Sequence, residues 1–372
     1  MSARPKRQVH PAASAVLILL VLVGVQWVWW RFLVYRPAGT GPGQMPPPSA
    51  TRPSDVLIHG RLDVSVYTIA GDPRPGDADG PSHAARFDRP TGIALDAEGN
   101  LYIADTGNNK VRMVSPSGDT TTLAGSDAGF ADGPVAQARF NAPCGICVGT
   151  DKSIYVADTG NRCLRRISAG RVSTLAGAPP SGGATQKALG LVISVAFVPG
   201  PKPLLIVAEA DSARLRLFTL EGAPAGDRKV PAPPISVFRN MEAVTMPSAG
   251  TLMIGPKILR NNIMDGTDEV SATEASRVKV QHPTGMSPFG KRWLVTDSGH
   301  RGVLLLKNDK VLVLAGTCSS GTPSGGFRDG DGRTAMFGML TGIVSDGKRF
   351  AYVVDTGNNS IRRLDISEVA AL

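Results

Sequence analysis

The segment ADTGNNKVR at residues 104–112 recurs along this chain of 372 residues, and the recurrence constrains the fold more than any other feature. The copies at 157–165 (ADTGNRCLR) and 354–362 (VDTGNNSIR) keep the acid, the Thr-Gly-Asn turn and the final arginine in register. A carboxylate, a hydroxyl and amides close together suggest a site, but a catalytic constellation is normally made once per chain. Self-similarity along a chain indicates a repeat architecture instead.

The repeating unit is longer than this motif and predicts about four short strands. It opens at TIAG (68–71), passes through the polar loop DGPSHAARFDRPTGI (79–93) and ends in the strand KVRMVS after the motif. Short apolar runs separated by Gly, Asn and Asp are typical of strands joined by tight turns. The 43 glycines and 29 prolines fit such a chain and argue against long helices. Four-stranded units repeated around an axis are the blades of a β-propeller.

The number of repeats predicts six blades in an all-β domain over residues 61–368. The first strands of the six units begin near Pro90, Pro143, Ile193, Met241, Pro283 and Leu340. The third and fourth copies are degraded, and Pro256 stands where the first copy has Asp105. The sixth unit lacks its fourth strand, while residues 64–71 form a strand of that type with no unit before them. We expect this strand to close the last blade and remove an exposed edge.

The pattern FxxPxGIxxDxxGNLYIADTGNNxVR resembles the NHL repeat, and the resemblance covers roughly residues 64–366. Copies one, two and six match it specifically, copy five matches fairly, and copies three and four match weakly. The resemblance implies a six-bladed NHL-type propeller that serves mostly as a binding platform. Some relatives hold such a propeller outside a membrane on a single anchor.

The repeated acid and arginine are interpreted as structural. The acid closes the second strand of each unit, and the arginine lies seven residues on, in the third strand. The acids are Asp105, Asp158, Glu209, Asp297 and Asp355. The arginines are Arg112, Arg165, Arg216 and Arg362, with Leu304 at the fifth position. Thr-Gly-Asn-Asn between them is tight-turn chemistry, so we expect the acid to cap the turn or pair with an arginine. The turn of the last copy also contains a glycosylation sequon at Asn358.

The N-terminus predicts a membrane anchor. Residues 12–30 are 19 consecutive uncharged residues, long enough to span a bilayer core, and tryptophans gather at one end. A cleaved signal peptide is the alternative, but the run exceeds the usual 7–15 apolar residues and lacks a good small-x-small cleavage site. We expect a cytoplasmic tail at 1–11, a signal-anchor helix at 12–35 and a Pro/Gly-rich linker at 36–60. The positive-inside rule then places the propeller on the extracytoplasmic or lumenal side.

The charge distribution disfavours nucleic acid as a partner. The net charge is +9, but residues 1–36 carry five basic residues and no acid, which leaves the remainder at +4. No basic run with interleaved aromatic residues stands out, and a nucleic-acid surface would show such clustering.

The positions equivalent to the residue after the proline that begins the first strand of a unit are the candidate channel mouth. They are Thr91, Cys144, Ser194, Glu242, Thr284 and Thr341. Amidating lyases resemble these repeats and place zinc-binding histidines there, but none of the six residues is His. Lactonase-type relatives coordinate a metal from several acids in the channel, whereas Glu242 is the only acid of this ring. We therefore expect neither enzyme activity, nor a metal, nor a cofactor, and the alternative is a lyase or lactonase-like hydrolase with a channel metal.

The remaining cysteines and acidic loops add no site. Cys144 and Cys147 form a lone CxxC, and a structural zinc site needs four ligands. Ordinary buried or half-buried thiols are favoured there, with a long-range disulfide as the alternative if the domain lies outside the cytosol. The DGDG stretch at 329–332 lacks the spacing of an EF-hand calcium loop. The sequence as a whole predicts a membrane-anchored, non-enzymatic module that binds a protein, peptide or glycan at the channel mouth.

Overall fold

The computed structural model describes 63–178, 189–212, 214–229, 283–290, 292–307, 310–316 and 325–370, and the strands at 251–254, 257–260 and 268–270. The predicted tail, anchor helix and linker lie outside these residues, and so do Glu242 and Cys318. Within the described parts of the chain, no helix has the length and apolar character needed to cross a bilayer.

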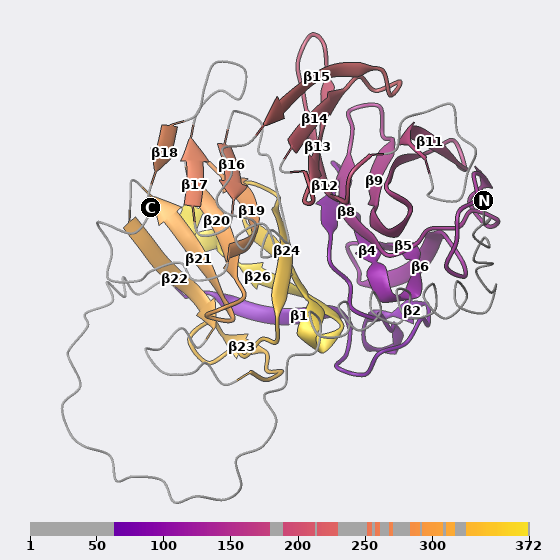
Figure 1. The fold of residues 1–372 in the computed structure, drawn as a ribbon. Coiled ribbons are helices and arrows are strands. Elements are labelled where there is room, and N and C mark those ends of the chain that lie inside the picture. The colour runs from indigo at the N-terminus through magenta and orange to yellow at the C-terminus, as the bar shows by residue number, and fades with distance from the viewer. Residues whose placement is uncertain are drawn as a thin grey trace, which may run out of the picture. The chain divides into compact units, whose positions relative to one another are not determined.

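The fold is an all-β propeller made of antiparallel sheets whose strands follow one another along the chain (Figure 1). The first blade comprises β3 (Ile93–Leu95), β4 (Leu101–Asp105), β5 (Lys110–Val114) and β6 (Asp119–Ala124), with β2 (Gly80–Pro81) at its edge. The second blade comprises β8 (Pro143–Val148), β9 (Ile154–Asp158), β10 (Cys163–Ser168) and β11 (Arg171–Gly177), with β7 (Gly133–Pro134) at its edge. The third blade comprises β12 (Val192–Val198), β13 (Leu204–Glu209), β14 (Arg214–Phe218) and β15 (Pro224–Lys229).

Two more blades complete this set. The penultimate blade comprises β19 (Pro283–Phe289), β20 (Arg292–Asp297), β21 (Gly302–Lys307) and β22 (Lys310–Gly316). The closing blade comprises β24 (Leu340–Ser345), β25 (Phe350–Asp355), β26 (Ser360–Asp365) and β1 (Ser65–Gly71), with β23 (Gly330–Asp331) at its edge. The short helix α3 (Ser367–Ala370) follows β26.

The prediction of six blades is wrong as made, because the described residues form five blades of four or more strands. A separate three-stranded sheet comprises β16 (Thr251–Ile254), β17 (Lys257–Arg260) and β18 (Asp268–Val270). It corresponds to the degraded fourth copy, whose predicted first strand near Met241 lies outside the described residues. That copy lacks the acid-and-turn motif that joins the second and third strands elsewhere, which is the physical reason why counting repeats overstated the number of complete blades.

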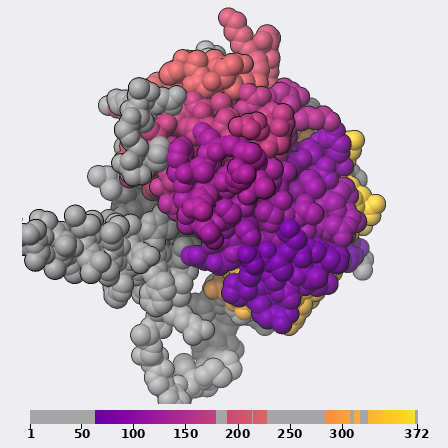
Figure 2. Space-filling view, turned by 90° about the vertical axis from the view of Figure 1, so that its right-hand side faces the viewer, coloured from indigo at the N-terminus to yellow at the C-terminus, as the bar shows by residue number. Residues whose placement is uncertain are grey.

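The innermost strands of the five blades lie side by side in the order β12, β8, β3, β24 and β19. Successive blades therefore pack against each other, and Figure 2 shows the first and second blades adjoining on one face, in indigo and magenta. The core lies between blades. Phe87 packs with residues of the first and closing blades, and Phe140 packs with residues of the first and second. Phe337 fills the matching place between the penultimate and closing blades.

The first described strand closes the last blade, as the sequence predicted. β1 pairs with β26 from Ser65 opposite Asp365 to Gly71 opposite Ser360, with one register shift. Thr68 reinforces the closure, because its backbone N–H and hydroxyl both donate to the carboxylate of Asp329, at 2.9 and 3.0 Å. The two ends of the described domain also meet where the N–H of Asp63 donates to Glu368.

Removing residues 63–72 should destabilise the closing blade. Val64 and Val66 are buried, and β26 would lose its outer partner. Loss of two buried valines alone costs roughly 3–6 kcal/mol, so a fragment that begins at residue 73 should melt at a clearly lower temperature than one that begins at residue 63. Thermal unfolding followed by circular dichroism tests this, and equal melting temperatures for the two fragments would contradict the closure.

Candidate functional site

Five of the six predicted channel-mouth residues are described, and they lie at the innermost strands, next to the neighbouring blades. Cys144, Ser194, Thr284 and Thr341 lie on β8, β12, β19 and β24, and Thr91 lies just before β3. Thr284, Thr341 and Ser194 expose only 2%, 4% and 8% of their surfaces, whereas Thr91 and Cys144 are half-buried.

The threonine hydroxyls of this ring bond to the backbone of the adjacent blade. Thr284 Oγ1 donates to the carbonyl of Leu340 at 2.8 Å. Thr341 Oγ1 donates to the carbonyl of Thr91 at 2.8 Å, and Thr91 Oγ1 donates to that of Cys144 at 3.2 Å. These bonds link the penultimate, closing, first and second blades in order. The hydroxyls thus have a structural role, and ligand contact by the ring remains a prediction.

Three more threonines repeat this pattern: Thr106 and Thr356, which sequence reasoning treated only as turn residues, and Thr296, which precedes Asp297 in the fifth copy. Thr296 Oγ1 donates to the carbonyl of Thr341 at 2.6 Å. Thr356 donates to Pro90 at 2.6 Å, and Thr106 donates to Pro143 at 2.7 Å. For Thr106 and Thr356 the signal was present in the Asp-Thr-Gly-Asn motif, because the threonine of that motif reaches the neighbouring blade.

The glycine that follows four of the six ring residues permits this close approach. A Cβ placed on Gly342 would lie 2.8 Å from the carbonyl oxygen of Thr91, and one on Gly145 would lie 2.5 Å from Cα of Ser194. A Cβ on Gly92 would overlap the carbonyl oxygen of Cys144. The glycine of the PxGI pattern is therefore required by the packing of backbone on backbone.

In the first copy of the motif, the repeated acid and arginine form a buried ion pair. Asp105 and Arg112 are both fully buried, with Nη1 of the arginine 2.8 Å from the carboxylate. Arg112 also donates to Asp79 and to the carbonyls of Arg86 and Ala78. All five N–H groups of the guanidinium are thereby used.

The second and closing blades repeat this arrangement. Arg165 pairs with Asp158 at 2.6 Å and with Asp132 at 2.7 Å. Arg362 pairs with Asp355 at 2.8 Å and with Asp329 at 2.7 Å. In both blades the guanidinium also lies between two phenylalanine rings, whose centroids are within about 5 Å of Cζ. These rings are Phe130 and Phe140 for Arg165, and Phe327 and Phe337 for Arg362.

The turn after each acid completes the arrangement. Thr106–Asn108 form one turn of 3-10 helix, and Asn109 ends it in the left-handed conformation with φ of 56°. Asn108 donates to Asp105 at 2.8 Å, as Asn358 donates to Asp355. Asn358 is only 9% exposed and its amide also donates to the carbonyl of Gly326. A glycan on this amide would require the folded turn to open.

Burial dominates the protonation of these acids. Removal from water raises the pKa of Asp105 to about 6, and the hydrogen bond from Asn108 and the charge of Arg112 offset this only in part. Burial likewise raises the pKa of Asp355 to about 6 and raises that of Asp158. A raised pKa in a cleft would suggest a general acid, but these carboxylates are completely enclosed and already bonded to their own blades.

The third and penultimate copies depart from the pattern. Glu209 accepts bonds from the N–H of Gly190 and the hydroxyl of Ser212, and Arg216 lies 3.7 Å away. In the penultimate blade, where Leu304 replaces the arginine, Nδ1 of His300 lies 2.8 Å from buried Asp297. The acid is thus kept in both blades, but it is held by different partners.

The described cysteines and acids form no reactive cluster. Cys147 and Cys163 are free thiols, as favoured from the sequence, and burial raises the pKa of Cys163 to about 12. No group of three or more potential metal ligands occurs within the described residues.

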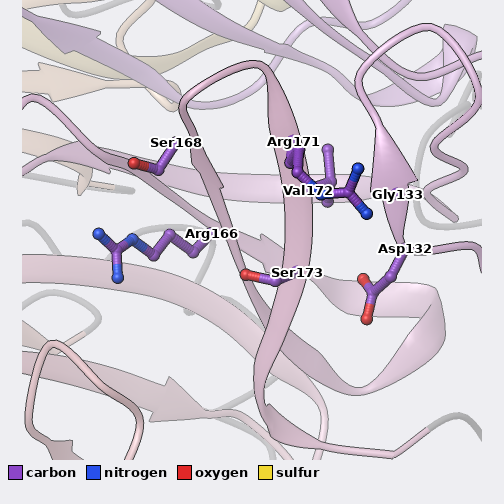
Figure 3. A pocket seen from close by; sticks show the side chains of 7 residues that line it. All are labelled: Asp132, Gly133, Arg166, Ser168, Arg171, Val172 and Ser173. Atoms are coloured by element: carbon purple, nitrogen blue, oxygen red, sulfur yellow. The ribbon is translucent and has the colours of Figure 1, made fainter.

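A pocket of about 470 Å³ lies on the outer part of the second blade. Its lining includes Asp132, Arg166, Arg171 and two serines. Figure 3 shows Arg166 on one side of the β-strands and Asp132 on the other, so these charged groups do not converge on one point. Asp132 is moreover engaged by Arg165, and the pocket shows no arrangement typical of a catalytic site.

Comparison with known proteins supports the repeat assignment. Residues 87–112 match the family model described as NHL repeat. A bovine protein named NHL repeat-containing protein 2 is 37% identical over 95 residues, which are 24% of this chain and 13% of that protein. The chloroplastic Protein SUPPRESSOR OF QUENCHING 1 of Arabidopsis thaliana is 34% identical over 94 residues, 25% of this chain and 9% of that protein. The matches thus span only a small part of these relatives.

Solved structures support the propeller fold alone. An auxiliary nutrient binding protein from Bacteroides ovatus superposes with a TM-score of 0.61 at 13% identity, covering 82% of this chain and 76% of that one. A gluconolactonase from Xanthomonas campestris superposes with a TM-score of 0.51 at 14% identity, covering 89% and 99%. Proteins with these two descriptions share the architecture, so the fold does not by itself separate a binding module from an enzyme.

Proposed function

We propose that this chain is a non-enzymatic binding or scaffold module that recognises a protein, peptide or glycan. The observation that supports it most is the use of the repeated motif: in three blades the acid is fully buried and paired with an arginine. The constellation that resembled an active site therefore stabilises each of these three blades internally. A ligand would therefore bind to the surfaces of the propeller. We propose the ring from Thr91 to Thr341 as the place of ligand contact, because pockets open at the axis in this architecture.

We further propose that residues 12–35 anchor the propeller to a membrane, with the propeller on the extracytoplasmic or lumenal side. The support is the 19-residue uncharged run and the basic residues before it. Protease protection on intact membranes tests this orientation. The propeller should be digested from the outside, and digestion only from the cytoplasmic side would refute it.

Blocking the ring tests the site of recognition. The fragment of residues 61–372 should capture specific components from extracts of intact cells, and Cys144→Trp, which adds bulk at the half-buried ring position, should lose them. Ser168→Trp, on the outer part of the same blade, is the matched control and should retain them. Equal melting temperatures would show that both variants fold.

Two results would overturn this proposal. Unchanged capture by folded Cys144→Trp would remove the ring as the site of contact. A stoichiometric metal in the purified protein, lost on Glu242→Ala together with hydrolysis of a lactone, would establish the enzymatic alternative.

A further inference from the structure

A row of large side chains crosses the closing blade next to the buried ion pair. Tyr352 on β25, Arg363 on β26 and Tyr67 on β1 are cross-strand partners in neighbouring strands. The same row in the second blade reads Tyr155, Arg166 and Ser173. An exposed tyrosine therefore stands in the closing blade where the second blade has a serine.

The guanidinium of Arg363 lies against aromatic rings. Its Cζ is 4.9 Å from the ring centroid of Phe350 and 5.7 Å from that of Tyr67. Arg349 lies 4.8 Å from the same Phe350 ring. Contacts of this kind fix the plane of a guanidinium without using its N–H groups.

Among the described residues, the guanidinium of Arg363 has no hydrogen-bond acceptor and no carboxylate partner, and its Nε is buried without a hydrogen bond. The equivalent Arg166 donates to Ser153 at 3.0 Å and to Asp151 at 3.2 Å. The adjacent Arg362 uses all of its N–H groups inside the blade. A partly buried guanidinium without a hydrogen-bond acceptor lowers the stability of the fold. Arg363 is therefore placed to bond an acceptor from another molecule.

The charged groups around Arg363 are already engaged. Arg349 pairs with Asp365 at 2.6 Å. Asp346 accepts the backbone N–H groups of Lys348, Arg349 and Phe350. Lys348, Arg349 and Arg363 together outnumber Asp346 and Asp365 by one, so the net formal charge of this surface is +1.

The surface is open. Tyr67 is 47% exposed, and the side chain of Arg349 is 59% exposed. Small ligands are usually enclosed in concave sites, whereas exposed tyrosine and arginine side by side are the residues that dominate protein–protein contacts.

We propose that Tyr67, Phe350 and Arg363 form a docking site for an acidic segment of a partner protein. An Asp or Glu carboxylate of that segment accepts two parallel N–H bonds from Arg363, the geometry that a guanidinium fork favours. The adjoining chain of the segment lies over the ring of Tyr67. The site is separate from the ring on the innermost strands and does not depend on the function proposed for that ring.

Binding of a labelled Glu-rich decapeptide to the fragment of residues 61–372 tests the proposal by fluorescence anisotropy. We expect the wild type to bind it and Arg363→Gln to weaken the binding about tenfold or more, which corresponds to about 1.4 kcal/mol or more. Arg363→Lys keeps the charge but not the fork and should fall between them. A peptide with Gln in place of every Glu should not bind.

Matched variants separate this site from general charge effects. Arg333→Gln removes one exposed, paired positive charge elsewhere on the closing blade and should change the affinity less than twofold. Equal weakening by Arg333→Gln and Arg363→Gln, or no peptide binding by the folded wild type, would overturn the proposal. Binding to phosphatidylserine vesicles but not to the peptide would also overturn it, in favour of a lipid surface. Cys144→Trp should leave peptide binding intact, so failure at the ring and failure here are distinguishable.

Discussion

Replacing Asp158 with alanine is expected to lower the free energy of unfolding by about 3–5 kcal/mol, because it leaves the buried charge of Arg165 without its nearest partner. Asp158 and Arg165 are both fully buried and lie 2.6 Å apart. The carboxylate also accepts bonds from Asn161 and from the N–H of Asn141. The substitution therefore removes the bonds that tie the second-strand turn to two other segments of the second blade.

The second blade offers a control for this experiment. Asp151 pairs with Arg166 at 3.2 Å near the surface, where both side chains are about one-third exposed. Such pairs contribute about 0–1 kcal/mol, although Asp151 also bonds Ser153. Urea unfolding of Asp158→Ala and Asp151→Ala should therefore give clearly different losses. Unchanged stability of Asp158→Ala combined with lost ligand binding would show that the repeated acid is a site after all.

The sequence predicted the parts of the fold that repeat. Equivalent positions of Asp105, Asp158 and Asp355 implied equivalent strands, and the orphan strand at 64–71 implied closure, because an unpaired edge needs a partner. For the acid itself the sequence left two expectations open, a cap of the turn or a pair with an arginine, since both roles fit an acid beside a tight turn. Repetition is informative because each copy tests the interpretation of the others.

What the sequence could not supply depends on contacts between segments far apart in the chain. The second acid of each arginine, such as Asp79 for Arg112, lies in the polar loop 33 residues earlier, and no local pattern links the two. The number of complete blades was also beyond this reasoning, because the degraded third copy forms four strands whereas the degraded fourth copy forms a sheet of three described strands. The sequence could not single out Arg363 either. What distinguishes Arg363 is that its guanidinium lacks a hydrogen-bond acceptor, and only the positions of the surrounding side chains reveal this.

Substituting Gly92 with alanine should destabilise the protein by more than about 3 kcal/mol, beyond the usual range for an overpacked core. The added Cβ would overlap the carbonyl oxygen of Cys144 on the adjacent blade and press on Ile146. A flexible side chain could rotate away, but a carbonyl oxygen moves only with its strand, and this one also accepts the hydroxyl of Thr91. The clash would therefore separate the first and second blades at the axis and break that bond.

Gly226→Ala is the matched control, because its Cβ would meet only the side chain of Leu217 at 3.9 Å. It should unfold like the wild type to within about 1 kcal/mol. If Gly92→Ala were as stable as this control, the innermost strands would have to be free to move apart, and the glycine of the repeat would need another explanation. A large difference in stability between the two variants would instead show that the PxGI glycine sets the spacing of the blades at the axis. The hydroxyl bonds between blades form only when the two backbones are in contact.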